Sequence, residues 1–250
     1  MRWEAEALWE AVAPLLPGFT VEILPEVDSS NSELMRRARA GRREPVLLVA
    51  QRQTAGRGRL GRSWHSDVGD SLTFSLGLDL APADWAGLSL AVGVSLAESL
   101  HPEVRLKWPN DLWLQDRKLA GILIETASFA DGRHAVIGVG INLAPRPAEG
   151  LSTAPAALRE LLPGIEAPEV LQRVFVPLVR DVLGFAQLGF APFRARFDAL
   201  DALRDRPVRL SDGTEGTAHG VTEDGSLLVH TAAGLHAVAS SEVSVRPAAR

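Results

Sequence analysis

The sequence of 250 residues contains no cysteine and is poor in lysine and asparagine. Without cysteine, the chain has no disulfide bonds, no thiolate nucleophile and no cysteine-ligated metal site. Only two of the 26 basic residues are lysines, and both lie in the segment RLKWPNDLWLQDRKLAG, residues 105–121. One of the three asparagines lies between them. Because a compact ammonium group that can reach a single oxygen requires lysine rather than arginine, this segment is the first candidate for a functional site.

The chain also lacks long hydrophobic runs. No stretch approaches 18 uninterrupted apolar residues, which predicts no membrane span. The N-terminus, MRWEAEALWEAVAPLL, contains three glutamates and lacks the layout of a signal peptide, so we expect a cytoplasmic protein. A formal net charge of -5 and a pI near 5.7 argue against non-specific binding to nucleic acid or to membranes. The hydrophobic content of 46% is ample for a buried core.

Hydrophobic periodicity predicts a mixed α/β chain whose character changes after Arg204. Helices are expected over residues 3–13, 29–41 and 83–100 and, with breaks at Pro163 and Gly189, over 152–203. Strands are expected over residues 19–24, 46–50, 71–78, 104–108, 111–114, 118–126 and 134–142. After Arg204, short alternating strands separated by Asp-Gly, Glu-Asp-Gly and Ala-Gly turns predict a small barrel-like β appendage. Fewer than about 20 residues precede the first strand, so no helix-turn-helix unit is expected there.

A loop rich in glycine and arginine, AGRGRLGRSW (55–64), is the second notable segment. Gly56, Gly58 and Gly61 satisfy the G-x-G-x-x-G fingerprint of dinucleotide sites, and the same letters nearly spell a P-loop with Arg62 in place of the lysine. Neither interpretation fits the context. QRQTA separates the glycines from the preceding strand, and no helix is expected to follow them.

The arginines of this loop instead favour anion binding. Arg57, Arg59 and Arg62 recur among glycines, so their guanidinium groups can fold over an anionic ligand. Trp64 offers a flat face on which a purine can stack. A solvated basic loop without a ligand is the alternative interpretation, and the loop alone does not decide between the two.

Five motifs together resemble those of the biotin protein ligases. They are DSSN (28–31), QTAGRGRLGRSW (53–64), KWPNDL (107–112), RKLAGILIE (117–125) and GVGINL (138–143). The resemblance covers nearly the whole chain, including the C-terminal β segment. It implies an α/β (α+β) catalytic domain related to class II aminoacyl-tRNA synthetases over residues 1–204, followed by a small SH3-like β-barrel domain over residues 205–250.

The resemblance also implies a two-step reaction. Biotin and ATP form biotinyl-5′-AMP and pyrophosphate, and a lysine of the biotin carboxyl carrier protein of acetyl-CoA carboxylase then takes the biotin. Mg²⁺ is expected to be held mainly by the phosphates of ATP, near Asp111. Family members with an N-terminal helix-turn-helix also repress transcription, whereas this chain is expected to be a monofunctional ligase that binds neither DNA nor membranes. The sequence does not decide between a monomer and a homodimer.

The motif matches assign roles to individual residues. Lys118 is expected at the reacting carboxylate and α-phosphate, with Arg57 and Arg59 as the other catalytic residues. Leu60 stands where the family often has a basic or polar residue, which removes one possible phosphate contact. The residues expected to bind biotin are Ser29, Ser30, Asn31, Gln53, Gly56, Arg57, Gly58, Arg59, Lys118, Gly121 and Leu123. Those expected to bind ATP are Arg57, Arg59, Arg62, Trp64, Lys107, Asn110, Asp111 and Asn142.

Two other functions compete with this interpretation. A lipoate or octanoate ligase on a related fold would accept a plain acyl chain, but the polar residues Ser29, Ser30 and Gln53 favour a ureido head group. A non-catalytic ligand sensor or nucleic-acid-binding protein would use the arginine loop and the β appendage. The acidic net charge and the absence of an expected DNA-binding unit weaken that second alternative.

Overall fold

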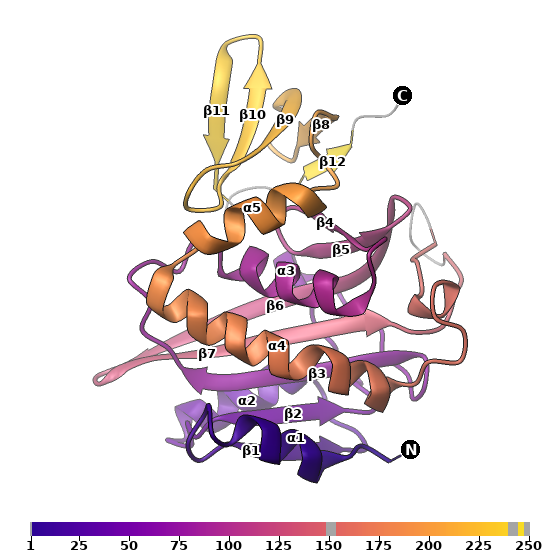
Figure 1. Cartoon of the computed structure of the whole chain (residues 1–250), viewed down its shortest axis with the longest axis vertical. Coiled ribbons are helices and arrows are strands. Elements are labelled where there is room, and N and C mark those ends of the chain that lie inside the picture. Colours follow the sequence, from indigo (N-terminus) through magenta and orange to yellow (C-terminus); the bar gives the residue numbers. More distant parts are fainter. Residues whose placement is uncertain (1, 149–153, 240–244, 248–250) are drawn as a thin grey trace. The chain divides into compact units, whose positions relative to one another are not determined.

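The computed structural model describes residues 2–148, 154–239 and 245–247, and it divides into two compact units (Figure 1). Unit 1 comprises the chain up to Ala81 together with Arg117–Arg180. Unit 2 comprises Pro82–Asp116 and the chain from Asp181 onward. The helix α4 (Ala167–Leu188) contains the last of these boundaries, between Arg180 and Asp181. Each unit is therefore described by itself.

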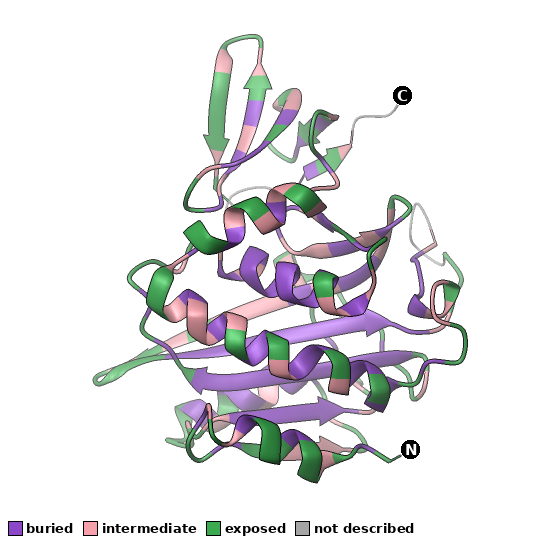
Figure 2. Cartoon of the chain, in the orientation of Figure 1, coloured by how far each residue is buried: buried purple, intermediate pink, exposed green. Residues whose placement is uncertain are grey.

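Unit 1 is built on a mixed β-sheet with the strand order β1-β2-β3-β7-β6. These strands are β1 (Thr20–Leu24), β2 (Val46–Ala50), β3 (Ser71–Asp79), β6 (Arg117–Phe129) and β7 (Gly132–Asn142). β1 and β2 are parallel, and the other neighbours are antiparallel. β2, β3 and β7 are buried along nearly their whole length (Figure 2), as strands covered on both faces are.

Helices cover both faces of this sheet. α1 (Ala5–Val12) and the first part of α4 lie on one face, and α2 (Ser30–Arg39) lies on the other (Figure 1). On the α4 face, the ring of Phe175 stands 5.8 Å from that of Phe19 and 6.0 Å from that of Phe74, measured between centroids. On the α2 face, a core cluster is formed by Leu34, Met35, Val46, Leu48 and Val136. The sheet thus packs against an apolar layer on each of its two faces.

Unit 2 combines two helices, a hairpin and the C-terminal sheet. The helices are α3 (Leu88–Leu100) and α5 (Ala191–Leu200), and the hairpin pairs β4 (Arg105–Lys107) with β5 (Asp111–Leu114). The antiparallel sheet has the order β11-β10-β9-β8-β12. Its strands are β8 (Pro207–Leu210), β9 (Glu215–Val221), β10 (Leu227–Thr231), β11 (Gly234–Val238) and β12 (Val245–Pro247).

The predicted mixed α/β class and the small C-terminal sheet are confirmed, and so are the breaks at Pro163 and Gly189. The predicted start of the helix α3 was wrong, because the helix begins at Leu88 rather than at residue 83. Gly87 has φ 81°, outside the helical region, and a Cβ there would meet Phe190 at 2.6 Å. The expected helix over 152–203 is wrong before α4, because residues 154–166 contain only a 3₁₀ turn (Leu158–Glu160). From Ala167 onward it is confirmed as α4 and α5, while residues 152 and 153 lie outside the described residues.

Asp201, directly after α5, is a largely buried carboxylate with an unusual titration. Burial raises its pKa from the ordinary 3.8 to about 6. The hydrogen bond from the Leu203 backbone N–H and the charge of Arg204 act against this shift, whereas Asp198 and Asp205 add to it. Its Oδ2 has no hydrogen-bond partner within the described residues. An ionised Asp201 therefore destabilises the folded state.

We expect the Asp201 carboxyl to reduce folding stability as pH rises from about 4 to about 6. Below this range the group is protonated in both states, but within it the unfolded chain releases the proton more readily than the folded chain. The shift corresponds to about 3 kcal/mol. Asp201→Asn should remove this contribution, so its unfolding free energy relative to the parent should grow across the range and then level off. Denaturant titrations at several pH values measure the difference, and a pH-independent difference contradicts the assignment.

Candidate functional site

Five small residues form a floor on the α2 face of the unit 1 sheet. Strand register places Ser75 beside Gly138, and Gly140 between Thr73 and Gly121. Because side chains alternate between the two faces of a strand, residues two apart share a face. The hydroxyl of Ser75 contacts α2, which assigns this face. We call Thr73, Ser75, Gly121, Gly138 and Gly140 the small-residue floor.

The N-terminus of α2 brings the predicted Ser-Ser-Asn corner to this floor. Ser29 caps the helix, with its Oγ accepting from the Ser32 N–H at 3.4 Å. Both the backbone N–H and the hydroxyl of Ser30 donate to Gln53 Oε1, at 2.7 and 3.0 Å. Since its oxygen is occupied in this way, the Gln53 amide nitrogen is left as a donor for a ligand.

An ion-pair network holds the start of α2 in place. Arg36 donates to both oxygens of Asp28, at 2.7 and 2.9 Å. These hydrogen bonds lower the pKa of Asp28 to about 2. Glu33 accepts from Arg36 and Arg37, and Arg37 also donates to Glu22 on β1. The DSSN turn is therefore fixed to its helix and to the sheet before any ligand binds.

Asn31 is fully committed to contacts within the protein. It is 3% exposed, and its Nδ2 donates to the Leu123 carbonyl and to Glu125, each at 3.0 Å. Its Oδ1 accepts from Ser75 at 2.7 Å. Because both amide hydrogens already have acceptors, we expect Asn31 to position the corner rather than to donate to biotin.

The glycine–arginine loop is closed by its own backbone. The Gly58 N–H donates to the Arg62 carbonyl at 2.7 Å, and the Trp64 N–H donates to Gly56 at 2.9 Å. A Cβ on Gly56 would lie 2.3 Å from the Trp64 carbonyl, so this close approach requires glycine. The loop contains only a 3₁₀ turn over Arg59–Gly61, which agrees with the rejection of the two phosphate-loop interpretations.

Arg57 reaches across to the sheet and pairs with Glu125 of β6. Its Nη2 lies 2.8 Å from one carboxylate oxygen and 2.6 Å from the other. The same carboxylate accepts from Asn31, so one residue links the loop to the corner. Glu125 was not among the residues predicted from the sequence. The only signal available was its position at the end of the RKLAGILIE motif.

Glu125→Gln is expected to loosen the loop, because it replaces the ion pair of Arg57 with a weaker neutral contact. Trypsin should then cleave after Arg57 or Arg59 several-fold faster in the ligand-free protein. Glu160→Gln is the matched control, since it removes a similarly exposed ion pair with Arg117. Equal cleavage rates for both variants would show that Glu125 does not restrain the loop.

Trp64 lies flat against two glycines of the floor. A Cβ on Gly140 would fall 2.3 Å from its Cε2, and a Cβ on Gly121 would fall 3.6 Å from its Cζ3. Any side chain at position 140 would therefore displace the indole. Two cations flank the ring: Lys118 Nζ is 5.8 Å and Arg146 Cζ is 5.6 Å from its centroid. An aromatic surface edged by positive charge suits a nucleotide, with its purine and its phosphates.

The backbone of Lys118 is tied to Asn142 at the end of β7. Asn142 Nδ2 donates to the Lys118 carbonyl at 3.2 Å, and the Ala156 N–H donates to the same oxygen at 2.9 Å. The ammonium group lies 3.1 Å from where a Cβ on Gly121 would be. The structure thus brings Lys118, Asn142 and Gly121 together beside Trp64, as the resemblance implies.

Two arginines of the loop and three residues of unit 2 also belong to the predicted set. Arg62 is exposed and contacts the loop through its backbone, and Arg59 is half-buried. Lys107, Asn110 and Asp111 lie in unit 2, where Lys107 Nζ stands 3.9 Å from Asp111 and 5.5 Å from the ring of Trp113. The part of these three residues in nucleotide binding stays a prediction.

Three buried polar atoms at the site lack a hydrogen-bond partner within the described residues. They are Thr73 Oγ1 on the floor, Trp64 Nε1 above it and Nε of Arg146. Buried polar groups are nearly always satisfied, and each exception calls for an explanation such as a ligand or bound water. All three belong to residues at or beside the Trp64 ring.

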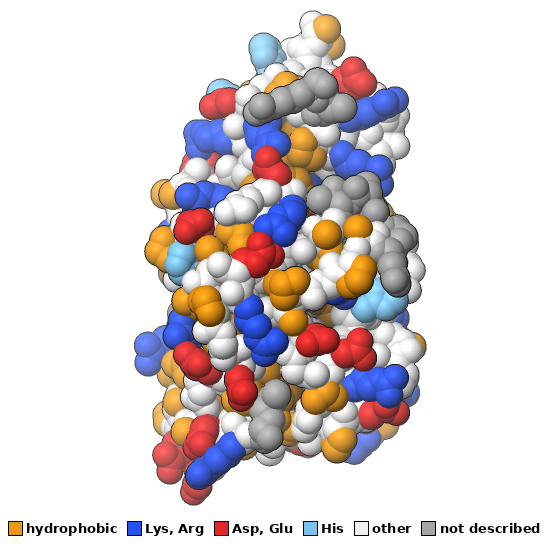
Figure 3. Space-filling view, turned by 90° about the vertical axis from the view of Figure 1, so that its right-hand side faces the viewer, with side chains coloured by type: hydrophobic (Ala, Val, Ile, Leu, Met, Phe, Trp, Pro, Cys, Tyr) orange, Lys and Arg blue, Asp and Glu red, His pale blue; other side chains and the backbone are white. Residues whose placement is uncertain are grey.

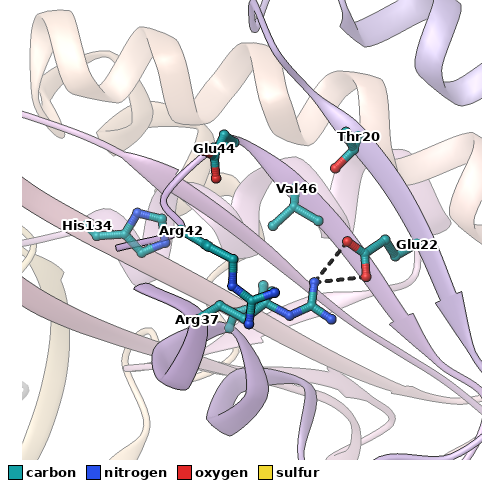
Figure 4. Close-up of a pocket in the computed structure, with 8 residues that line it drawn as sticks. Thr20, Glu22, Arg37, Arg42, Glu44, Val46 and His134 are labelled. Atoms are coloured by element: carbon teal, nitrogen blue, oxygen red, sulfur yellow. Dashed lines mark hydrogen bonds and ion pairs between the residues drawn. The ribbon is translucent and has the colours of Figure 1, made fainter. Parts of the chain in front are cut away.

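A separate cavity of about 100 Å³ lies where the C-terminal end of α2 meets β1 and β2 (Figure 4). Arg37 and Glu22 pair across it, and Arg42, Glu44 and the buried His134 also line it (Figure 4). The Nδ1 of His134 is 2.8 Å from Asp79. None of the residues predicted for biotin or ATP lines this cavity, so it is distinct from the candidate site.

The charges on the surface do not point to a particular partner. Basic and acidic side chains are interspersed over the face shown in Figure 3. Among the described residues, no helix has the length and apolar character to cross a membrane. The same residues contain no cluster of three or more histidine or acidic side chains able to hold a metal ion.

Comparison with known proteins identifies the family. Residues 25–142 match the Biotin/lipoate A/B protein ligase family, and residues 205–246 match the Biotin protein ligase C terminal domain. The chain is 38% identical to the bifunctional ligase/repressor BirA of Escherichia coli K12, over 93% of this chain and 76% of that protein. It is 32% identical to the biotin–[acetyl-CoA-carboxylase] ligase of Paracoccus denitrificans, over 88% of this chain and 98% of that protein.

A solved structure agrees in fold. The biotin protein ligase of Aquifex aeolicus in complex with biotin and ATP superimposes with a TM-score of 0.76 at 30% identity, covering 91% of this chain and 99% of that one. The fold and the matches to known proteins thus define the chain as a ligase. The chain belongs to the biotin protein ligase family.

Proposed function

We propose that this ligase makes biotinyl-5′-AMP from biotin and ATP and transfers the biotin to a lysine of the biotin carboxyl carrier protein of acetyl-CoA carboxylase. The observation that carries the proposal is the convergence of the Ser-Ser-Asn corner, Arg57, Trp64 and Lys118 on one small-residue floor. The name of the Paracoccus relative and the ligands of the Aquifex structure support it.

In the first step, a carboxylate oxygen of biotin attacks the α-phosphorus of ATP, and the bond from that phosphorus to the bridging oxygen breaks to release pyrophosphate. Two anions must approach each other, so catalysis needs positive charge and accurate placement. Lys118 supplies a point charge where carboxylate and phosphate meet, while Arg57 and Arg59 close over them from the loop. Mg²⁺ would be held mainly by the phosphates of ATP, near Asp111, and would neutralise part of the charge of the triphosphate.

In the second step, the carrier's lysine amine attacks the acyl carbon of the mixed anhydride, and AMP leaves. No enzyme nucleophile is needed, because the acid is already activated. The role of the enzyme is to keep the intermediate in place and shielded from water until the carrier arrives. The loop that carries Arg57 and Arg59 is suited to this, because backbone hydrogen bonds close it beside Trp64.

The corner supports biotin over a plain fatty acid. Ser29, Ser30 and Gln53 present hydroxyl groups and an amide nitrogen beside the floor. A ureido ring has one carbonyl and two N–H groups to pair with such partners, whereas the acyl chain of octanoate would leave the Gln53 amide nitrogen without an acceptor. We therefore expect at least about a hundred-fold preference for biotin over octanoate.

We also propose that residues 1–204 carry catalysis, that residues 205–250 form an SH3-like domain, and that the protein works in the cytoplasm. The match of residues 205–246 to the C-terminal domain of the family supports the division.

Transfer to a carrier domain tests the proposed function. The purified ligase is incubated with biotin, ATP, Mg²⁺ and the carrier domain of the host carboxylase, and the carrier is analysed by intact-mass spectrometry. One biotinyl group per carrier is expected, and none on a carrier whose target lysine is replaced by arginine. An unmodified carrier in the presence of a competent, folded ligase would exclude this partner.

A further inference from the structure

The motif KWPND (107–111) contains a tryptophan that was not among the residues predicted to bind ATP. Trp108 is fully buried, and its Nε1 donates to the carbonyl of Gly225 at 3.0 Å. The two residues are 117 positions apart in the sequence. Gly225 belongs to the segment TEDGS (222–226) between β9 and β10, which we call the β9–β10 turn. The C-terminal sheet therefore contacts the motif through a buried hydrogen bond.

The β9–β10 turn is held in shape by its own hydrogen bonds. The Thr222 N–H donates to the Ser226 carbonyl at 2.9 Å, and the Gly225 N–H donates to the Thr222 carbonyl at 3.1 Å. The Thr222 hydroxyl donates to the Asp224 carboxylate, and both groups accept from the Ser226 N–H, at 3.0 and 3.1 Å. Gly225 has φ 85°, in the left-handed region that favours glycine. These contacts fix the direction in which the Gly225 carbonyl points.

Two further contacts tie the β4–β5 hairpin to the chain that follows α5. The Ala202 N–H donates to the Leu106 carbonyl at 2.7 Å, just before the motif. Arg206 donates to both carboxylate oxygens of Asp116, at 2.5 and 3.3 Å, just after β5. The hairpin is thus held before its turn, at its turn and after its second strand. Of the three contacts, the one through Trp108 lies inside the motif itself.

We propose that the β9–β10 turn is a positioning element for the adenylation step. Through the Gly225 carbonyl and the indole of Trp108, it sets the orientation of the motif side chains on either side of that indole. The inference rests on the proposed function, because it takes Lys107, Asn110 and Asp111 as residues that serve ATP. Small displacements of such groups cost rate, since the reacting atoms must be placed accurately. Thr222 and Gly225 are positioning residues in this role and touch no reacting group.

Thr222→Val tests the turn without touching the motif. It keeps the size of the side chain but removes the hydroxyl that joins Asp224 to Ser226. In ATP–pyrophosphate exchange with biotin, kcat/KM for ATP is expected to fall about ten-fold. The Kd for biotin should stay within about two-fold of the parent value, because the biotin corner belongs to unit 1. Thr222→Ser keeps the hydroxyl and should restore the parent kinetics.

Two matched controls separate positioning from the loss of a hydrogen bond as such. Thr231→Val removes a hydroxyl that donates to the Gly234 carbonyl at 3.1 Å in the neighbouring β10–β11 turn, and it should exchange at the parent rate. Trp108→Phe keeps an aromatic ring but removes the donor to Gly225, so it should show the same loss of about ten-fold in kcat/KM for ATP. Trp9→Phe is its control, because Trp9 Nε1 also donates to a backbone carbonyl at 3.0 Å, in unit 1.

Hydrogen exchange followed by mass spectrometry provides a readout that does not depend on activity. Thr222→Val is expected to speed the exchange of backbone amides in the peptide that covers residues 105–114 several-fold, whereas Thr231→Val should not. If the parent shows no pyrophosphate exchange with biotin, the proposed function fails, and this peptide still decides whether the turn restrains the motif.

A merely structural role gives a different pattern from positioning. It predicts that Thr222→Val and Trp108→Phe lower the free energy of unfolding while kcat/KM for ATP stays at the parent value. That pattern would overturn the proposal, and so would unchanged amide exchange over residues 105–114 in Thr222→Val. A loss in kcat/KM for ATP that appears in both variants, is absent from both controls and is rescued by Thr222→Ser would support it.

Discussion

Lys118→Ala should reduce biotin-dependent ATP–pyrophosphate exchange by about a thousand-fold, while the fold stays intact. Lys118 stands beside both the indole of Trp64 and Gly121, where the reacting carboxylate and phosphate are expected to meet. Without the ammonium group, two anions must approach with only the loop arginines to compensate. Preorganised charges of this kind contribute several kcal/mol to the transition state.

Two further variants make this prediction specific. Lys118→Arg keeps the charge but replaces a compact ammonium with a planar fork, so we expect it to remain at least about ten-fold impaired. Arg173→Ala removes a cation from an exposed pair with Glu169 on α4, away from the floor, and should exchange at the parent rate. Near-normal exchange by Lys118→Ala would show that the ammonium group is not where charge develops.

Gly138→Ala is expected to disrupt the biotin corner and to destabilise the fold. A Cβ at position 138 would lie 2.2 Å from Oδ1 of Asn31, far inside contact distance. Asn31 is held by hydrogen bonds to Leu123, Glu125 and Ser75 and has no alternative position without losing them. We expect a loss of about 2–4 kcal/mol in unfolding free energy. We also expect a rise of at least about ten-fold in KM for biotin, because the corner moves with Asn31.

Gly184→Ala is the matched control for this substitution. Gly184 lies inside α4, and a Cβ there would meet nothing within 4 Å. The change should leave KM unchanged and raise stability by up to about 1 kcal/mol, because alanine is the better helix former. If Gly138→Ala keeps the parent's stability and its affinity for biotin, Asn31 is not the anchor of the corner.

The motifs predicted several of the residues that the structure brings to one surface, but not how the protein holds them. DSSN, the arginine loop and GVGINL each contain residues whose chemistry is visible locally, and these residues meet on the floor. Glu125 and Ser75 were missed because their roles depend on strand register. Glu125 meets a loop arginine 68 positions away, and Ser75 reads as an ordinary residue of an alternating strand.

Some helix boundaries are likewise determined by local sequence, and others by tertiary contacts. The break at Gly189 follows from the freedom of glycine, and φ is 68° there. The start of α3 was placed about one turn too early. The apolar pattern begins at residue 83, but Gly87 packs against Phe190, more than 100 residues further along the chain. No local pattern contains that contact.

ATP–pyrophosphate exchange with biotin, lipoate, octanoate and no added acid tests the central claim most directly. It measures formation of the acyl-adenylate and needs no carrier protein. The site described here predicts exchange that depends on biotin and is at least about a hundred-fold weaker with octanoate. Exchange that is as fast with lipoate or octanoate, or no exchange with any acid by a folded sample, would contradict the assignment of the Ser29–Asn31 corner to a ureido ring and of Lys118 to adenylation.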